Sequence, residues 1–253
     1  HSSRSIQAPV VISAVADDLI EGIDRLFPAR MGQASANSGS PNPEDDVPKG
    51  LDEEGARIVA PNSGYMLAID DDELMALGAR HDLVIRLMYR PGLFVARGDM
   101  VMGVWPPDRV SRGLAEQLEQ AFILGQQRTP TQDIEFAMDQ LVEVAVRSLS
   151  PSTNDPFTAM GCIDWLGVAL SRLAEMDLPP PYRYDDAGRL RVIVNAPLTF
   201  PGLVDTAFSQ IRQFAGSSVA VHMRLLEVIA TILPHTCLLY TSPSPRDRTR
   251  SRM

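Results

Sequence analysis

The chain has 253 residues and a mass of 27.7 kDa, and its 45% apolar and 22% charged residues are typical of a folded globular protein. Its 23 basic and 32 acidic side chains give a net charge of −9, which disfavours nucleic acid as a partner because an acidic surface repels the phosphate backbone. The sequence contains no run of 18 uncharged apolar residues, so it predicts no membrane span within these residues.

The first 56 residues divide into a helix and a loop. Apolar residues recur at helical spacing between Pro9 and Phe27 with acidic residues between them, which predicts an amphipathic helix within residues 1–28. Residues 29–56 are rich in Gly, Ser, Asn, Pro and acidic residues. We therefore expect a disordered loop there.

A small β unit is predicted for residues 57–107. Strand-like runs at 57–60 and 64–69 are followed by a short helix at 70–80 and a third strand-like run at 82–89. The spacing G-x-x-V-x-x-G-x-x-V at residues 92–101 resembles half of a biotinyl or lipoyl carrier domain, in which a lysine carries the cofactor. The only lysine, Lys49, lies in the predicted loop, which excludes carrier chemistry. We expect a structural, β-sandwich-like unit.

Residues 108–236 have a helical pattern, with helices expected at 109–125, 130–149, 156–176, 200–215 and 217–233. Two β-rich runs on either side of an Asp-Asp-Ala-Gly turn predict a hairpin at 182–195, which we expect to cap the helical bundle. The predicted fold class is therefore α+β, a small β unit followed by a mainly α-helical bundle with one β-hairpin.

Residues 128–133 form the first candidate site. The run Thr-Pro-Thr-Gln at 129–132 has the order of a helix start, with a cap, a first-turn proline and a returning amide. An arginine beside the free N–H groups of a helix start would reinforce an anion site. Arg128 and Asp133 are thus candidate ligand-binding residues, and helix capping is the alternative interpretation.

The second candidate site is a polar loop between two apolar helices. Asp155 precedes a proline and can cap the next helix, but a cap needs only one polar residue. Ser150, Asn154 and Asp155 are therefore candidates for contact with a ligand or partner, and we expect Arg212 or Gln213 of a later helix to meet them. Because about 20 helical residues separate Arg128 from this loop, the two sites can combine only across a symmetric contact in a homo-oligomer.

Asp164 and Arg172 are the charged residues inside the predicted helix 156–176. They lie eight residues apart, about two helical turns, and so project from nearly the same side. We expect structural ion pairs with Arg147 or Arg212 from neighbouring helices.

The known signatures of metal sites and enzymes are absent from the sequence. The four histidines are far apart, and the acidic run at 70–73 lacks the Gly and the distal Glu of a calcium loop. There is no P-loop, no dinucleotide-binding glycine motif and no nucleophile elbow. We expect no metal and no cofactor, and a non-enzymatic role is favoured. The alternative is an enzyme of unfamiliar type that uses Arg128, Asp133, Asn154 and Asp155.

Residues 237–253 differ abruptly from the rest of the chain. Their back-translation resembles a library-preparation sequencing adapter, which would make this segment an artefact of metagenomic origin, and we exclude it from fold reasoning. Without it, Cys162 is the only cysteine, so no intrachain disulfide is expected.

Several stretches resemble one bacterial family. They include SGYMLAID, LVIRLMYRPGLFVARGD, FILGQQRTPTQDIEFAMDQLVEVAVRSLSPSTNDPFTAMGCIDWLG and DTAFSQIRQFAGSSVAVHMRLLEVI. The resemblance, over about residues 5–233, is to the predicted integral-membrane proteins of domain of unknown function 2254. It implies N-terminal membrane helices upstream as a partner and a location at the bacterial inner membrane with this domain on the cytoplasmic side, but no known activity. Our leading hypothesis is a non-enzymatic role in ligand sensing, gating or interaction.

Overall fold

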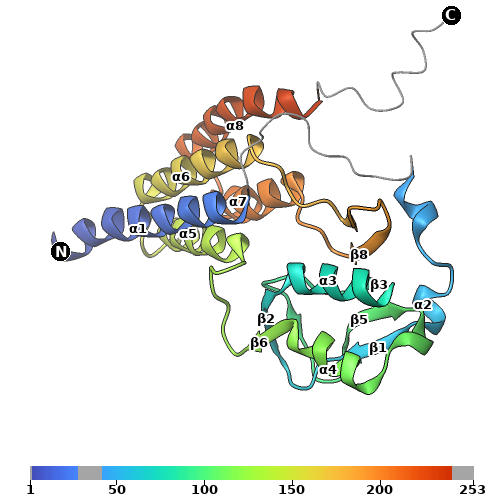
Figure 1. Cartoon of the computed structure of the whole chain (residues 1–253). Coiled ribbons are helices and arrows are strands. Elements are labelled where there is room, and N and C mark those ends of the chain that lie inside the picture. The colour runs from blue at the N-terminus through green and yellow to red at the C-terminus, as the bar shows by residue number, and fades with distance from the viewer. Residues whose placement is uncertain (1, 28–41, 241–253) are drawn as a thin grey trace, which may run out of the picture. The chain divides into compact units, whose positions relative to one another are not determined.

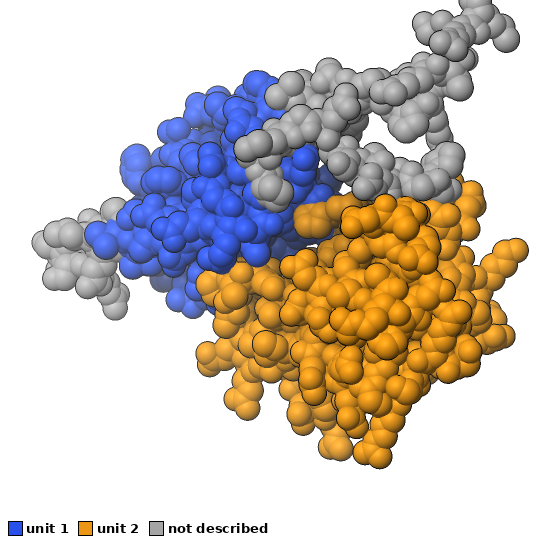
Figure 2. All heavy atoms as spheres, viewed as in Figure 1, with its two compact units in different colours: residues 1–34, 134–178, 198–253 blue, residues 35–133, 179–197 orange. Residues whose placement is uncertain are grey.

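The computed structural model describes residues 2–27 and 42–240, which form two compact units. The helical unit is built from residues 1–34, 134–178 and 198–253, and the β-rich unit from residues 35–133 and 179–197, as coloured in Figure 2. The chain therefore enters the β-rich unit twice, once after the first helix and once between two later helices. The α+β class predicted from the sequence is confirmed.

The helical unit packs around one central helix, α6. Its helices are α1 (Ser2–Leu26), α5 (Ile134–Ser148), α6 (Pro156–Ala174), α7 (Phe200–Phe214) and α8 (Val219–Tyr240), shown in Figure 1. Helix α6 contacts each of the other four, and its buried side chains include Leu166 and Leu170. This explains why α6 is apolar around much of its circumference: a helix covered on several sides has little solvent-facing surface.

The β-rich unit contains two sheets that share one core. The strands are β1 (Ala56–Val59), β2 (Gly64–Ile69), β3 (Val84–Leu87), β4 (Phe94–Val95), β5 (Met100–Trp105), β6 (Phe122–Gly125), β7 (Tyr182–Tyr184) and β8 (Leu190–Val194). The sheet orders are β1-β5-β3-β8-β7 and β4-β2-β6. Met66 of the smaller sheet and Ile85 and Met102 of the larger one belong to the same buried cluster, so the sheets are layered as in a sandwich.

Short helices complete the β-rich unit. They are η1 (Pro43–Asp46), α2 (Leu51–Glu54), α3 (Asp71–His81), η2 (Pro107–Arg109) and α4 (Arg112–Gln120). Leu77 of α3 and Leu118 of α4 are fully buried in the cluster shared by the sheets. Asp70 begins α3 as its N-cap by accepting a hydrogen bond from the Glu73 N–H at 3.0 Å, as expected for an acidic helix start.

Two expected elements have a different place or type. The hairpin at 182–195 belongs to the β-rich unit and not to the helical domain, because β8 pairs in parallel with β3 and joins the larger sheet. The helix expected at 109–125 ends at Gln120, and Phe122–Gly125 is strand β6, paired antiparallel with β2. In both cases a strand far away in the sequence supplies the hydrogen bonds that local periodicity cannot reveal.

Part of the loop expected at 29–56 is ordered. Residues 42–55, here called the strap, contain η1 and α2. Leu51 is buried beside Leu190 and Ile193, and the hydroxyl of Tyr184 donates to the Asp46 carboxylate at 2.9 Å. One buried leucine and a few polar contacts therefore hold a segment whose composition suggests disorder. Residues 28–41 lie outside the described structure.

The adapter-like segment at 237–253 is described only in part. Its first four residues form the last turn of α8, whose backbone is helical to Tyr240. Residues 241–253 lie outside the described structure, so the interpretation of this segment stays a prediction.

Candidate functional site

The loop of Ser150, Asn154 and Asp155 forms a turn and a helix cap. One Asp155 carboxylate oxygen accepts the Thr158 N–H at 3.2 Å, and the other accepts the Thr158 hydroxyl at 2.7 Å. The Ser150 hydroxyl donates to the hydroxyl of Thr153 at 3.2 Å. Asn154 adopts φ 45°, a left-handed conformation that asparagine tolerates in turns. The carboxylate of Asp155 is therefore occupied by capping.

Arg212 does not join this loop. It is exposed on α7, and the described residues include no hydrogen bond or ion pair between Arg212 or Gln213 and Asn154 or Asp155. The expected contact within one subunit is thus not formed. The cap of α6 is satisfied by its own first turn.

Arg128 and Asp133 meet as an ion pair inside the β-rich unit. The Arg128 Nε donates to Asp133 Oδ2 at 2.7 Å and its Nη2 donates to Oδ1 at 3.1 Å, and Asp133 is only 3% exposed. Gly92, with φ +93°, lies so close that a Cβ atom there would be 2.5 Å from Asp133 Oδ2. Because this carboxylate neutralises the guanidinium, the pair has the form of a structural clamp rather than an open anion site.

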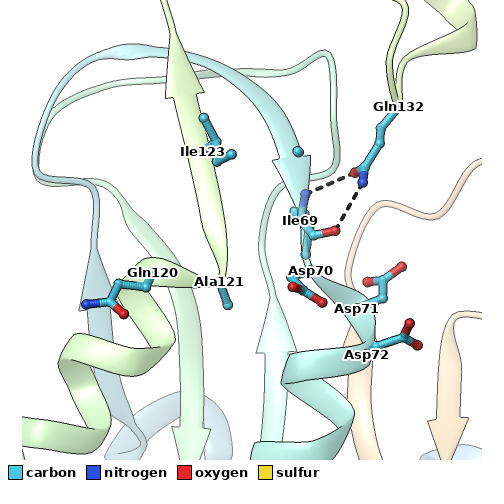
Figure 3. Close-up of a pocket in the computed structure, with 9 residues that line it drawn as sticks. Ile69, Asp70, Asp71, Asp72, Gln120, Ala121, Ile123 and Gln132 are labelled. Carbon is cyan, nitrogen blue, oxygen red and sulfur yellow. Dashed lines mark hydrogen bonds between the residues drawn. The ribbon is translucent and has the colours of Figure 1, made fainter.

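The run at 129–132 is not a helix start. Helix α5 begins at Ile134, and the Gln132 amide instead pairs with the backbone of Ile69 at the end of β2. Its oxygen accepts the Ile69 N–H at 3.0 Å and its nitrogen donates to the Ile69 carbonyl at 3.3 Å, as the dashed lines of Figure 3 show. Gln132 thereby replaces a neighbouring strand at the end of β2, beyond the two residues that pair with β4.

A cavity of about 530 Å³ lies beside Gln132, and Figure 3 shows the acidic start of α3 along it. Two of its three acidic side chains have structural roles. Asp70 caps α3, and Asp71 forms an ion pair with Arg183, with 2.6 Å between Asp71 Oδ1 and Arg183 Nη1. The described residues contain no group of three or more His, Cys, Asp or Glu side chains placed to hold a metal ion.

Asp164 and Arg172 form ion pairs with partners other than those expected. Arg172 binds Asp24 of α1 in a two-bond pair of 2.6 and 3.0 Å, and Asp164 faces Arg224 of α8 at 3.5 Å. Both pairs tie neighbouring helices to α6. Arg147 pairs instead with Glu143 on its own helix.

Cys162 is enclosed in the core of the helical unit. Burial raises the pKa of its thiol to about 12, so the thiol stays protonated at neutral pH. It packs as a small apolar side chain and lacks the thiolate character of a nucleophile.

A buried arginine network joins β8 to the end of α3. Arg191 is 2% exposed, and it donates to Asp185 at 2.8 Å and to Asp82 at 2.9 Å. Burial alone would raise the pKa of Asp185, but hydrogen bonds from the Arg189 backbone and the Arg191 side chain outweigh it and hold the pKa at about 2. The hairpin turn is therefore anchored by an ionised carboxylate.

A second cavity, of about 540 Å³, lies on the outer face of the larger sheet beneath the strap. Here it is called the Arg86 cavity; its lining is Glu44, Val47, Arg86, Pro181, Tyr182, Ile193, Val194, Asn195 and Pro197. Arg86 projects from β3, and its side chain is 19% exposed. Sequence reasoning did not single it out, because an arginine in a β-rich run is also the pattern of an ordinary solvent-facing strand position.

Arg86 has unused hydrogen-bonding capacity. Its Nη1 pairs with Asp52 of the strap at 2.7 Å, whereas its Nε–H is buried and has no partner among the described residues. Arg183, Arg191 and Arg224 each have one such N–H as well, so what distinguishes Arg86 is that its side chain also lines this cavity beside apolar residues. The lining thus combines one incompletely paired guanidinium with apolar and aromatic side chains.

The helical unit and the β-rich unit together form an α+β protein, in which a cavity lined by Arg86 and by apolar and aromatic side chains lies over the larger sheet. The chain belongs to the family described as "Predicted membrane protein (DUF2254)", whose match covers residues 1–231. It is 27% identical over 236 residues to the uncharacterized proteins Mb1321c of Mycobacterium bovis and Rv1290c of Mycobacterium tuberculosis, covering 92% of this chain.

The chain spans 44% of the length of these relatives. No solved structure matches it. Among the residues that the structure describes, no helix combines the length and apolar character needed to cross a bilayer.

Proposed function

We propose that this chain is a non-enzymatic sensing domain of a bacterial inner-membrane protein, and that the Arg86 cavity holds its ligand. The observation that carries this proposal is that two residues lining the cavity lie next to the two segments that connect the β-rich unit to the helical unit. Pro181 lines it just after the segment that leaves α6, and Pro197 lines it just before the segment that enters α7. A ligand that shifts either proline would act directly on the connections to two helices of the bundle.

The ligand class follows from the lining. A guanidinium with an unpaired N–H selects a carboxylate or another small anion, because charge-assisted hydrogen bonds are the strong ones. Val47, Tyr182 and Ile193 offer apolar surface beside it. A small carboxylate with an apolar body fits both features.

The strap gives the site a reversible closure. It is held by the Asp52–Arg86 pair, by the Asp46–Tyr184 hydrogen bond and by buried Leu51. A carboxylate that binds the Nε–H shares the positive charge of Arg86 with Asp52 on Nη1, which weakens the Asp52–Arg86 pair. Binding would therefore loosen one of the contacts that fix the strap, which is the kind of change that a sensing domain transmits.

The binding test uses acetate, butyrate, hexanoate and inorganic phosphate as probes, with thermal unfolding and calorimetry of the full chain as readouts. We expect saturable binding that strengthens from acetate to hexanoate, because each added methylene buries apolar surface. Arg86→Gln should abolish the binding, and Arg57→Gln, at an exposed arginine on β1, is the matched control. Binding of hexanoate that Arg86→Gln leaves unchanged would overturn the proposal, as would no saturable binding of any probe.

A second variant keeps this test valid if Arg86→Gln fails to fold. Asp52→Asn removes only the competing carboxylate from an exposed position on the strap. It should tighten carboxylate binding several-fold, since it frees Nη1 of Arg86. Unchanged or weaker binding in Asp52→Asn would contradict the assignment of Arg86 as the anchoring group.

The cytoplasmic location and the upstream membrane helices belong to the same proposal. Family membership supports attachment to a membrane, and the length of the relatives supports further segments outside this chain. Reporter fusions at the end of this domain in the full-length gene test its sidedness. A fusion active only outside the cytoplasm would contradict it.

A further inference from the structure

Strand β6 is an edge strand that lacks the usual protection. The edges of the two described sheets are β1 and β7 in the larger sheet and β4 and β6 in the smaller one. Exposed edges in folded proteins are commonly blunted by a charged residue or by a very short strand. Strands β1 and β7 carry Arg57 and Arg183, and β4 has two residues, whereas β6 is the uncharged run Phe-Ile-Leu-Gly. The edge of β6 is thus suited to pairing with a further strand.

The backbone of Phe122 points toward this open edge. Opposite residues in an antiparallel pair either exchange both backbone hydrogen bonds or turn both backbone groups away from each other. Phe122 lies opposite Ile69, whose N–H and carbonyl bind the Gln132 amide on the far side of β2 (Figure 3). The N–H and carbonyl of Phe122 therefore face away from β2.

Leu124 has the same orientation two residues further along β6. It lies opposite Met66, whose N–H and carbonyl form hydrogen bonds of 2.9 and 2.8 Å with the backbone of residues 92–93. Met66 thus turns away from β6, and the backbone of Leu124 faces the open edge. The described residues form no hydrogen bond with the backbone groups of Phe122 and Leu124 on this side. The edge therefore offers two donors and two acceptors in the register of a strand.

A groove of about 550 Å³ lies beside these backbone groups. Its lining joins Phe122 and Leu124 to the polar side chains of Asn62, Ser63, Glu119 and Gln126, and we call it the edge groove. Glu119, exposed at the end of α4, is the only charged residue among those described in this lining. Side chains alternate along a strand, so Ile123 lies on the other face of β6, where it is 57% exposed.

From these features we infer that the edge groove binds an extended peptide segment, with alternating basic and apolar side chains, as an added strand of the smaller sheet. Such a strand satisfies the open backbone groups, and its side chains alternate between the two faces of the sheet. Those beside Phe122 and Leu124 enter the edge groove, where Glu119 favours Lys or Arg. Those beside Ile123 cover its apolar side chain. This inference is independent of the Arg86 cavity.

A second copy of β6 fits the edge groove less well. Two paired β6 strands would offer each other the side chains of Phe122 and Leu124 on the groove side, but Phe122 is buried in the core of its own unit. The pairing would also bring two Glu119 side chains to one interface, in a chain whose net charge is −9. The charge of the groove and of the whole chain favours a basic partner.

Fluorescence anisotropy of the peptide fluorescein-Lys-Val-Lys-Val-Lys-Val-amide with the full chain tests the inference. Because the contact is short, we expect a dissociation constant on the order of 100 μM. N-methylation of the Lys amides removes the donors that face β6 and should abolish binding. N-methylation of the Val amides, which face away from β6, is the matched control and should leave binding unchanged.

A pair of variants tests the role of the groove charge. Glu119→Lys should weaken peptide binding about three- to tenfold, since an attraction at an exposed site becomes a repulsion. Glu116→Lys changes the net charge equally but lies outside the groove lining, where Glu116 pairs with Arg112. It should alter binding by less than about twofold.

Three results would overturn the inference: no saturable binding up to about 1 mM peptide, equal binding of the two methylated peptides, or an equal effect of Glu119→Lys and Glu116→Lys. Sedimentation velocity identifies the other occupant. A chain that binds no peptide and sediments as a dimer would assign the edge to a second copy.

Discussion

Gly167 of α6 lies directly against the side chain of Val228 of α8. A Cβ atom on Gly167 would stand 2.3 Å from the Cγ1 of Val228, a distance that no side chain tolerates. Val228 cannot turn away easily, because β-branched residues in helices strongly prefer one rotamer. The absence of a side chain at Gly167 is therefore what lets α8 lie against the central helix.

We predict that Gly167→Ala destabilises the helical unit. Overpacking of this kind costs about 1–3 kcal/mol, despite the better helix propensity of alanine. Gly161→Ala on the same helix is the matched control: its Cβ atom would meet nothing within 4 Å, so it should stabilise by roughly 0.5–1 kcal/mol. Urea denaturation measures both. Restored stability in Gly167→Ala/Val228→Ala would confirm the contact, and equal effects of the two single variants would contradict it.

The cap of α6 gives a second prediction. Asp155→Ala should destabilise the chain by about 1 kcal/mol, the usual cost of losing an N-cap. Thr158→Val, which removes only the hydroxyl that donates to Asp155, should cost less. Denaturant unfolding gives both values. A loss of several kcal/mol in Asp155→Ala would show that this carboxylate does more than cap the helix.

Asp185 makes stability depend on pH in the acid range. Its pKa in the folded chain is about 2, below the ordinary value of 3.8. A carboxyl with a lowered folded pKa contributes its full stabilisation above its unfolded pKa, and that contribution is lost as the pH falls from about 4 to about 2. We therefore expect the melting temperature of Asp185→Asn to fall less steeply across this window than that of the wild type.

The matched control for this window is Asp186→Asn, at the exposed neighbouring position of the same turn. Its melting temperature should follow the wild-type pH profile. If the melting temperature of Asp185→Asn fell with pH as steeply as that of the wild type, the acid-sensitive group would be a different residue.

Local signals predict some of this structure well. Strand β2 and helix α3 lie where the sequence places them, because an apolar run and an acidic cap are features of adjacent residues. Although the β7–β8 hairpin has a local signal, the pairing of β6 with β2 joins residues 53 or more apart, and the pairing of β8 with β3 joins residues 107 apart, so neither of these pairings has one. The same is true of Gln132, whose amide fits the pattern of a cap but binds Ile69.

The candidate site, too, could not be predicted from local sequence signals. Ser150 to Asp155 attracts attention because polar residues are adjacent in sequence, yet most of their contacts stay within the loop and the first turn of α6. The Arg86 cavity is assembled from the strap, β3 and the β7–β8 hairpin. A site gathered from three separate segments is visible only once the sheet order is known.

Hydrogen–deuterium exchange with and without hexanoate tests the central claim, that occupancy of the Arg86 cavity is transmitted to the ends of α6 and α7. The account predicts slower exchange in the hairpin at 182–195 and altered exchange in residues 172–178 and 198–203, all lost in Arg86→Gln. If hexanoate bound saturably but changed the exchange rates only in residues that line the cavity, the cavity would be a ligand site whose occupancy is not transmitted to the helices, and the claim would be contradicted.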